Sequence, residues 1–120
     1  MTKPTMSPLT PAVFHILLAL ADGDRHGYAI MQRVDVDSDG SVKMGPGTLY
    51  GALSRMTKSG LVGQSETRVD PEMDDQRRIY YRLTSKGRDT LGVELKRYRS
   101  LVHIGRKRQP GALTASGLAT

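Results

Sequence analysis

Apolar positions in the first third of the chain follow helical spacing. Residues 11–22 are apolar on most sides, and Thr10 and Pro11 form a typical helix start, with the threonine as cap and the proline in the first turn. A helix that is apolar nearly all round belongs in a core, so we expect this helix to be central and to end near Asp22-Gly23. A second helix is expected over residues 26–36.

A third helix is predicted over residues 46–60, with Ser59-Gly60 as its stop, after a short strand at residues 41–44. Leu49, Leu53 and Met56 recur at i, i+4 and i+7, which is the spacing of one buried helix face. The opposite side of this helix would then carry a largely polar set, namely Tyr50, Gly51, Ser54, Arg55 and Lys58.

After the third helix the pattern changes to period two, which predicts a β-hairpin. Residues 61–68 suit one strand, and Ile79, Tyr81 and Leu83 alternate with other residues along a second strand. The segment 69–76 between them is polar and contains a proline, so we expect it to be a long loop.

Thr84 can cap a long final helix over residues 85–108. Its apolar positions form one stripe at near-helical spacing, made of Leu91, Leu95, Tyr98 and Val102. A three-helix core with a small hairpin is too small to cover a stripe of this length, and an exposed apolar stripe promotes association. We therefore expect a homodimer formed through this helix, with the apolar first helix sharing the interface.

The order of the predicted elements is that of a winged helix-turn-helix. We expect a mainly α protein with a small β-hairpin, followed by a C-terminal dimerisation helix. In that fold the third helix enters the DNA major groove, and the hairpin loop, or wing, reaches the DNA backbone or minor groove. The expected divisions are a flexible arm (1–8), a DNA-binding domain (9–84), the dimerisation helix (85–108) and a disordered tail (109–120).

Composition limits the classes of protein that fit. The chain has 120 residues, which suits one domain, and no cysteine, which excludes disulfides, cysteine-based zinc sites and thiol catalysis. The longest apolar run, residues 16–21, is far shorter than the roughly 20 residues that span a bilayer, and no secretory signal pattern precedes it. We therefore expect a cytoplasmic protein with no membrane contact.

Positive charge is concentrated in the second half of the predicted final helix. The 18 Lys and Arg residues exceed the 12 Asp and Glu residues by six, and this excess corresponds to Lys96, Arg97, Arg99, Arg106, Lys107 and Arg108. The other charges balance, although a fold can still gather the basic ones on one face. Charge alone leaves open whether the basic run is solvated or contacts DNA or an acidic partner.

No motif in the sequence supports catalysis or the binding of a cofactor or metal. Asp35-x-Asp37-x-Asp39-Gly40 begins like a calcium loop, but Pro46 stands where the bidentate glutamate is required. Gly45-x-Gly47 lacks the rest of a nucleotide-binding motif, and the three histidines do not have metal-ligand spacing. We therefore expect neither an enzyme nor a bound cofactor or metal.

The exposed side of the predicted third helix carries groups suited to DNA. Hydroxyl and basic side chains can bind phosphates or base edges, and the N–H groups of the first turn form an anion-binding helix end. With the flanks of the wing, the candidate DNA-binding residues are Lys43, Thr48, Tyr50, Ser54, Arg55, Lys58, Arg68, Arg77 and Arg78. Two alternatives stay open, a winged-helix adaptor that binds protein and a small enzyme whose site is not visible in the sequence.

Three blocks of the sequence stand out as a set. They are LTPAVFHILLALADGDRHGYAIM, GPGTLYGALSRMTKSGLV and RRIYYRLTSKGRDTL, which lie in order within residues 9–91. The set resembles the PadR-type transcriptional regulators, in which HGY, GTLYGAL and YYRLT fall on the second helix, the third helix and the last strand. The combination is far more specific than any single block.

The resemblance implies a cytoplasmic prokaryotic repressor that is homodimeric and, in some members, released by small aromatic ligands. It places Thr48, Tyr50 and the adjacent helix face on DNA. Drug-binding members carry a tryptophan on the dimerisation helix, whereas this sequence has none, and Tyr98 is a partial substitute. The effector site, where one exists, is expected near Phe14, His15 and Tyr98.

Overall fold

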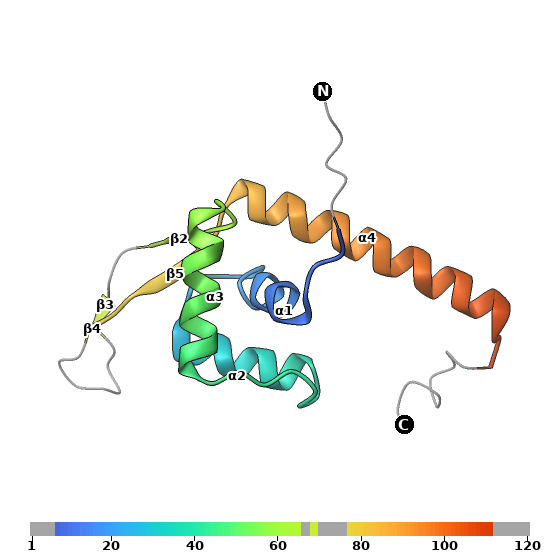
Figure 1. The fold of residues 1–120 in the computed structure, drawn as a ribbon, viewed down its shortest axis with the longest axis horizontal. Helices are drawn as coiled ribbons and strands as arrows, with labels where there is room; N and C mark the ends of the chain where they lie inside the picture. The colour runs from blue at the N-terminus through green and yellow to red at the C-terminus, as the bar shows by residue number, and fades with distance from the viewer. Residues whose placement is uncertain (1–6, 66–67, 70–76, 112–120) are drawn as a thin grey trace.

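The computed structural model describes residues 7–65, 68–69 and 77–111, and this part is mainly helical with a small antiparallel sheet at one end (Figure 1). The helices are α1 (Pro11–Ala19), α2 (Gly27–Asp37), α3 (Pro46–Lys58) and α4 (Ser85–Arg108). The strands are β1 (Arg25–His26), β2 (Val62–Gln64), β3 (Arg68–Val69), β4 (Arg77–Arg78) and β5 (Tyr80–Leu83). The predicted winged helix-turn-helix with a long C-terminal helix is confirmed. The predicted arm (1–8), wing loop (69–76) and tail (109–120) lie mostly outside the described residues.

α1 starts where the sequence predicts and forms the centre of the fold. The Thr10 hydroxyl oxygen accepts a hydrogen bond from a first-turn N–H at 3.2 Å, and Pro11 occupies the first turn. Ile16 is fully buried because α2, α3 and α4 all pack against α1. The helix ends at Ala19, earlier than the predicted Asp22-Gly23, because the following backbone tightens into i→i+3 turns.

A single hydrophobic core joins the helices to the sheet. α2 contributes Ile30 and Val34, and α3 contributes Leu49 and Leu53, in each case from one face of the helix. The whole buried apolar set is Phe14, Ile16, Leu17, Ala19, Leu20, Ile30, Val34, Leu49, Ala52, Leu53, Met56, Val62, Tyr81, Leu83 and Leu91.

The sheet differs from the prediction in its first strand. Residues 41–44, predicted as a strand, have no regular secondary structure, and the Val42 N–H donates to the Ser38 hydroxyl oxygen at 3.0 Å. The third strand of the sheet is instead β1, which pairs with β5 so that His26 lies opposite Tyr80. The sheet order is β1-β5-β2. A strand of two residues is too short to show an alternating pattern, so the sequence does not reveal it.

The hairpin extends outward from this sheet through β3 and β4, in which Arg68 lies opposite Arg78. Ile79, which the alternation groups with Tyr81 and Leu83, falls at the break between β4 and β5 and is 45% exposed. The buried alternation of this strand therefore begins only at β5.

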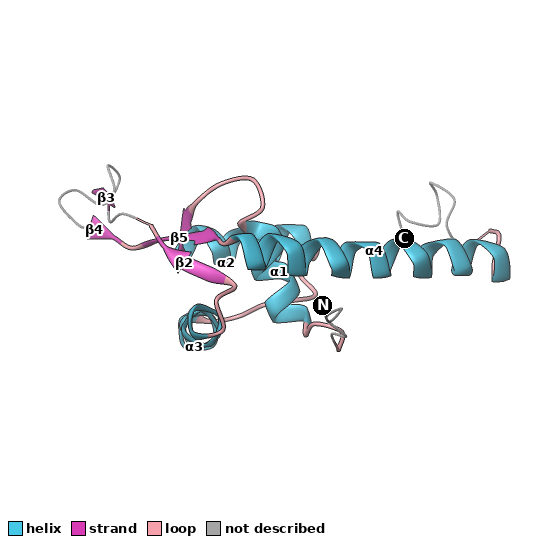
Figure 2. Ribbon diagram, turned by 90° about the horizontal axis from the view of Figure 1, so that it is seen from above, coloured by secondary structure: helices cyan, strands magenta, loops and turns pink. Residues whose placement is uncertain are grey.

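α4 starts at the predicted cap, where the Thr84 hydroxyl oxygen accepts a hydrogen bond from the Gly87 N–H at 3.0 Å. Its first half packs on α1 and β5, whereas its second half extends away from the other described elements (Figures 1 and 2). α3 and the strands lie at the opposite end of the molecule in both views. A helix of 24 residues is about 36 Å long, which exceeds the length that so small a domain covers.

Candidate nucleic-acid interface

α3 buries one face and exposes the other, as its periodicity predicts. Leu49, Ala52, Leu53 and Met56 enter the core. Of the candidate residues, Thr48, Tyr50, Ser54, Arg55 and Lys58 are exposed on the opposite face, and Lys43 is exposed in the loop before the helix. The structure therefore brings six of the nine candidate DNA-binding residues onto α3 and its entry loop, while their contact with DNA stays a prediction.

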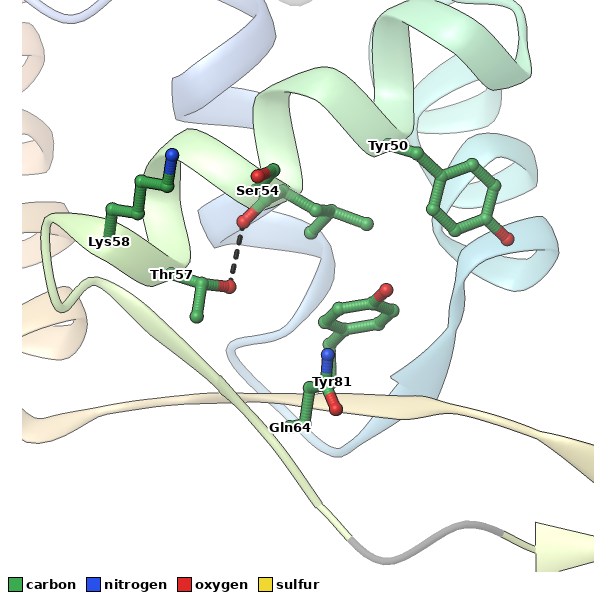
Figure 3. Close-up of a pocket in the computed structure, with 7 residues that line it drawn as sticks. Tyr50, Ser54, Thr57, Lys58, Gln64 and Tyr81 are labelled. Atoms are coloured by element: carbon green, nitrogen blue, oxygen red, sulfur yellow. Dashed lines mark hydrogen bonds between the residues drawn. The ribbon is translucent and has the colours of Figure 1, made fainter.

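A hollow of about 340 Å³ separates α3 from the sheet (Figure 3). The hollow is lined by Tyr50, Leu53, Ser54, Thr57, Lys58, Gln64 and Tyr81. Thr57 and Gln64 were not among the candidates from the sequence. Gln64 comes from β2, and only its pairing opposite Tyr81 brings it to α3, so no sequence signal could have identified it.

Tyr81 forms part of the lining of this hollow and is largely buried. Burial raises the pKa of the Tyr81 phenol, and the neighbouring Tyr50 raises it further. The Tyr81 phenol is therefore protonated at neutral pH and presents a neutral hydroxyl that can donate a hydrogen bond.

Arg78 is held at the junction between the hairpin and α2. Its Nη1 lies 3.2 Å from Nδ1 of His26, the N-cap of α2, and its guanidinium lies 5.9 Å from the centre of the Tyr28 ring. The same Nδ1 accepts the N–H of Ala29 at 3.2 Å. Because an arginine can only donate, both donors are directed at the single lone pair of Nδ1, which they share. Arg78 thus anchors the base of the wing, a role that the sequence did not indicate.

The other two arginines of the predicted wing, Arg68 and Arg77, occupy positions of the β3–β4 pair. Their backbone lies beyond the sheet on the outward part of the hairpin (Figure 1). From residue 96 onwards, the exposed basic residues of α4 are Lys96, Arg99, Arg106, Lys107 and Arg108. Arg97 differs from them because it pairs with a buried carboxylate on the same helix.

That carboxylate is Glu94, which is 1% exposed and which sequence reasoning missed. Its two oxygens accept hydrogen bonds at 2.9 Å, one from the Leu9 N–H and one from Nε of Arg97. Burial raises the pKa of Glu94, but the hydrogen bonds from Arg97, Leu9 and Tyr98 together with the positive charge of Arg97 outweigh burial, and the net pKa lies below its ordinary value. Glu94 is therefore charged at neutral pH and ties α4 to the segment that leads into α1.

The predicted apolar stripe of α4 is only partly covered within one chain. Leu91 is buried and Tyr98 is partly buried against α1, whereas Leu95 is 42% exposed and Val102 is 41% exposed. Leu101 and Ile104 add further exposed apolar surface around Val102; they were not in the predicted stripe.

Phe14, His15 and Tyr98, the residues predicted to surround an effector, form one aromatic cluster. The ring centres of Phe14 and Tyr98 are 4.9 Å apart, and those of Phe14 and His15 are 5.2 Å apart, both edge-to-face. Nδ1 of His15 is buried and has no hydrogen-bond partner among the described residues. Burial raises the pKa of the Tyr98 phenol, as does the neighbouring Glu94.

In residues 7–65, 68–69 and 77–111, no group of three or more His, Cys, Asp or Glu side chains could hold a metal ion. No helix within those ranges is both long and apolar enough to cross a bilayer.

Solved structures share this architecture. A PadR family transcription regulator from Clostridium difficile R20291 is 26% identical, with a TM-score of 0.66 over 82% of this chain and 97% of its own. Bacillus subtilis PadR, solved in complex with operator DNA, is 22% identical, with a TM-score of 0.60 over 69% of this chain and 45% of its own. At 22% identity, the similarity to Bacillus subtilis PadR is a similarity of fold.

Sequence relatives cover a similar region. A 37.1 kDa protein of transposon TN4556 from Streptomyces fradiae is 39% identical over 79 residues, which are 66% of this chain but only 20% of that protein. The family model described as "Transcriptional regulator PadR-like family" matches residues 16–93. Because this match covers more than half of the chain, the chain belongs to the PadR-like family of transcriptional regulators.

Proposed function

We propose that this chain is a cytoplasmic homodimeric repressor that binds double-stranded DNA at an inverted-repeat operator. The observation that carries the proposal is the face of α3, which exposes hydroxyl, phenol and basic groups beside a hairpin. In winged helix-turn-helix proteins this helix enters the major groove. The relative from Bacillus subtilis, which has the same fold, binds operator DNA.

The roles of the residues follow from their chemistry. Thr48 and the first-turn N–H groups of α3 would bind a phosphate, and Arg55 would read a guanine or bind a phosphate. Tyr50 and Ser54 would donate hydrogen bonds to phosphates or base edges, and Lys58 adds charge next to the hollow. Lys43, Arg68, Arg77 and Arg78 would supply further phosphate contacts.

The dimer would form through α4. Residues 9–84 would act as the DNA-binding domain and residues 85–108 as the dimerisation helix, whose exposed Leu95 and Val102 are the surface to be covered. Two-fold symmetry between the two chains would present two α3 helices to successive major grooves, about 34–36 Å apart. This spacing is the physical reason for an inverted-repeat operator.

Release by an effector would act at the cluster of Phe14, His15 and Tyr98, which joins α1 to α4. A small aromatic ligand would have to replace the ring contact between Phe14 and Tyr98 and would thereby change how α4 sits on the domain. Titration with aromatic ligands should then change both tyrosine fluorescence and DNA affinity. Unchanged signals across a panel of such ligands would remove the effector from the proposal.

The test of DNA reading begins with selection of duplexes from a randomised library by the purified protein. We expect enrichment of an inverted repeat, and fluorescence anisotropy should show binding to the selected duplex that weakens linearly with the logarithm of salt concentration. Equal, weak binding to the selected and a shuffled duplex would contradict the proposal and favour the protein-binding adaptor.

Arg55→Ala makes this test specific to α3. If Arg55 reads a base, its loss should weaken binding to the selected duplex by about 1–3 kcal/mol and relax the preference at one position. Arg33→Ala is the matched control, because it removes the same charge from α2, where Arg33 pairs with Asp22 at 3.2 Å. An adaptor reads no base, so either variant should bind the selected duplex and the shuffled duplex alike.

A further inference from the structure

Gly27 occupies the first position of α2 and is buried. Its backbone conformation is one that any residue can adopt, and glycine is a poor helix former, so the helix itself does not need a glycine there. What requires a glycine at this position is a side chain of α3. A Cβ added at Gly27 would lie 2.5 Å from Cζ and 2.8 Å from Cε1 of Tyr50, and closer still to the Tyr50 hydroxyl. The three nearest atoms thus all belong to one side chain.

Tyr50 lies on the face of α3 that we propose to contact DNA. Only 46% of its surface is exposed, so other parts of the protein cover the rest. Figure 3 shows its ring pointing from α3 towards the start of α2. The ring therefore lies over the site where any other residue at position 27 would place its Cβ. Gly27 and Tyr50 belong to the HGY and GTLY segments, so the two segments meet at this contact.

We propose that Gly27 is a positioning residue for DNA binding. Because Gly27 has no side chain, the Tyr50 ring can pack against its backbone, and this contact keeps Tyr50 in the orientation that contacts DNA. The inference rests on the proposed function and adds a residue to it that does not itself touch DNA. A tyrosine on an open helix surface samples several rotamers, and ordering it on binding weakens affinity by about three- to tenfold. A ring already seated on Gly27 loses this freedom on folding, before DNA arrives.

The experiment is a double-mutant cycle in full-length protein with Gly27→Ala, Tyr50→Ala and the double variant. Binding to the selected duplex is measured by anisotropy over a salt series. We expect Gly27→Ala to weaken binding about tenfold, with an unchanged salt slope because no charge is removed. In the Tyr50→Ala background the same change should have no further effect, since the added methyl group then has space. Gly111→Ala, where an added Cβ meets nothing within 4 Å, serves as the matched control.

Two results would overturn the inference. The first is wild-type affinity in Gly27→Ala, and the second is a double variant whose loss is the product of the two single losses. If Gly27→Ala fails to fold, the double variant decides: recovery of folding supports the contact with Tyr50, and failure shows that Gly27 serves α2 alone. If the wild-type protein selects no duplex, the proposed function itself has failed. If the wild-type protein binds a selected duplex and Gly27→Ala binds it equally well, only the inference about Gly27 has failed.

Discussion

At the scale of single residues, Glu94 joins two segments that are distant in the chain. Its carboxylate binds the Leu9 N–H, 85 residues earlier, and Arg97 on its own helix. A buried carboxylate with two donors stabilises a fold only while it is charged. The junction between α4 and the start of α1 therefore depends on pH.

Glu94→Gln should lower the free energy of unfolding at pH 7 by about 1–3 kcal/mol, because a neutral amide makes weaker hydrogen bonds than a carboxylate. The pKa of Glu94 is lowered on folding, so its contribution is fully present above its unfolded value near 4.5 and is lost as pH falls through the folded pKa. Urea unfolding from pH 7 to pH 3 should thus show wild type and variant converging in acid. A constant difference across that range would contradict the assignment.

Asp89→Asn is the control for this experiment. Asp89 is an exposed carboxylate on the same helix, so its loss should leave the stability near that of wild type at each pH. A similar effect of both changes would mean that helix charge in general, and not the buried contact, controls stability.

Single residues also show where sequence reasoning works. The caps Thr10 and Thr84 were predicted because each hydroxyl accepts from an N–H three residues later, within the local sequence. Glu94 was missed because its partner Leu9 is distant and a glutamate on a helix is ordinarily solvated. Gly27 was seen within a motif, but its contact with Tyr50 depends on how α2 packs against α3.

At the scale of elements, the start of α4 is bound to the turn that follows α3. The Thr84 hydroxyl lies 2.6 Å from the Gly60 carbonyl oxygen, and Lys86 Nζ donates to the Ser59 carbonyl oxygen at 2.8 Å. Gly87 lies so close to the Leu61 carbonyl that an added Cβ would collide with it. The helix proposed to read DNA and the helix proposed to form the dimer therefore meet at one joint, made by residues 59–61 and 84–87.

Two glycines on α4 test this joint. Gly87→Ala should lower the free energy of unfolding by about 1–3 kcal/mol, since the methyl group must displace the Leu61 carbonyl. Gly92→Ala should raise it by up to about 1 kcal/mol, because Gly92 faces open space and alanine favours a helix. Urea unfolding at one fixed protein concentration measures both. Equal effects of the two changes would mean that the close approach at Gly87 contributes nothing.

Elements with a strong period were predicted correctly, and short ones were not. α3 was identified with its buried face because Leu49, Leu53 and Met56 repeat over more than two turns. β1 was missed because its two residues hold together only by pairing with β5, a contact between distant parts of the chain. The hollow beside α3 was missed for the same reason, since Gln64 reaches it only through the sheet.

At the scale of the whole molecule, the exposed apolar stripe of α4 determines the proposed assembly. Leu95→Gln with Val102→Gln removes apolar surface from the exposed stripe without changing charge or helix propensity greatly. Sedimentation at micromolar concentration should show a dimer for wild type and a monomer for the variant. Affinity for the inverted repeat should fall by about a hundredfold, because two linked half-sites bind far more tightly than one.

The comparison with a single half-site separates assembly from DNA reading. A monomeric variant retains α3. On a duplex with one half-site only one α3 helix can bind, so the affinity of the variant for this duplex should equal that of wild type. Val36→Gln is the matched control, because Val36 is 74% exposed on α2 and lies outside the stripe, so this variant should stay dimeric. A Leu95→Gln, Val102→Gln variant that remains dimeric would mean that the interface lies elsewhere. A wild type that is monomeric would mean that there is no such interface. In either case the contacts at Gly87 would still fix α4 relative to α3 within one chain, but they would not set the spacing of two α3 helices on DNA.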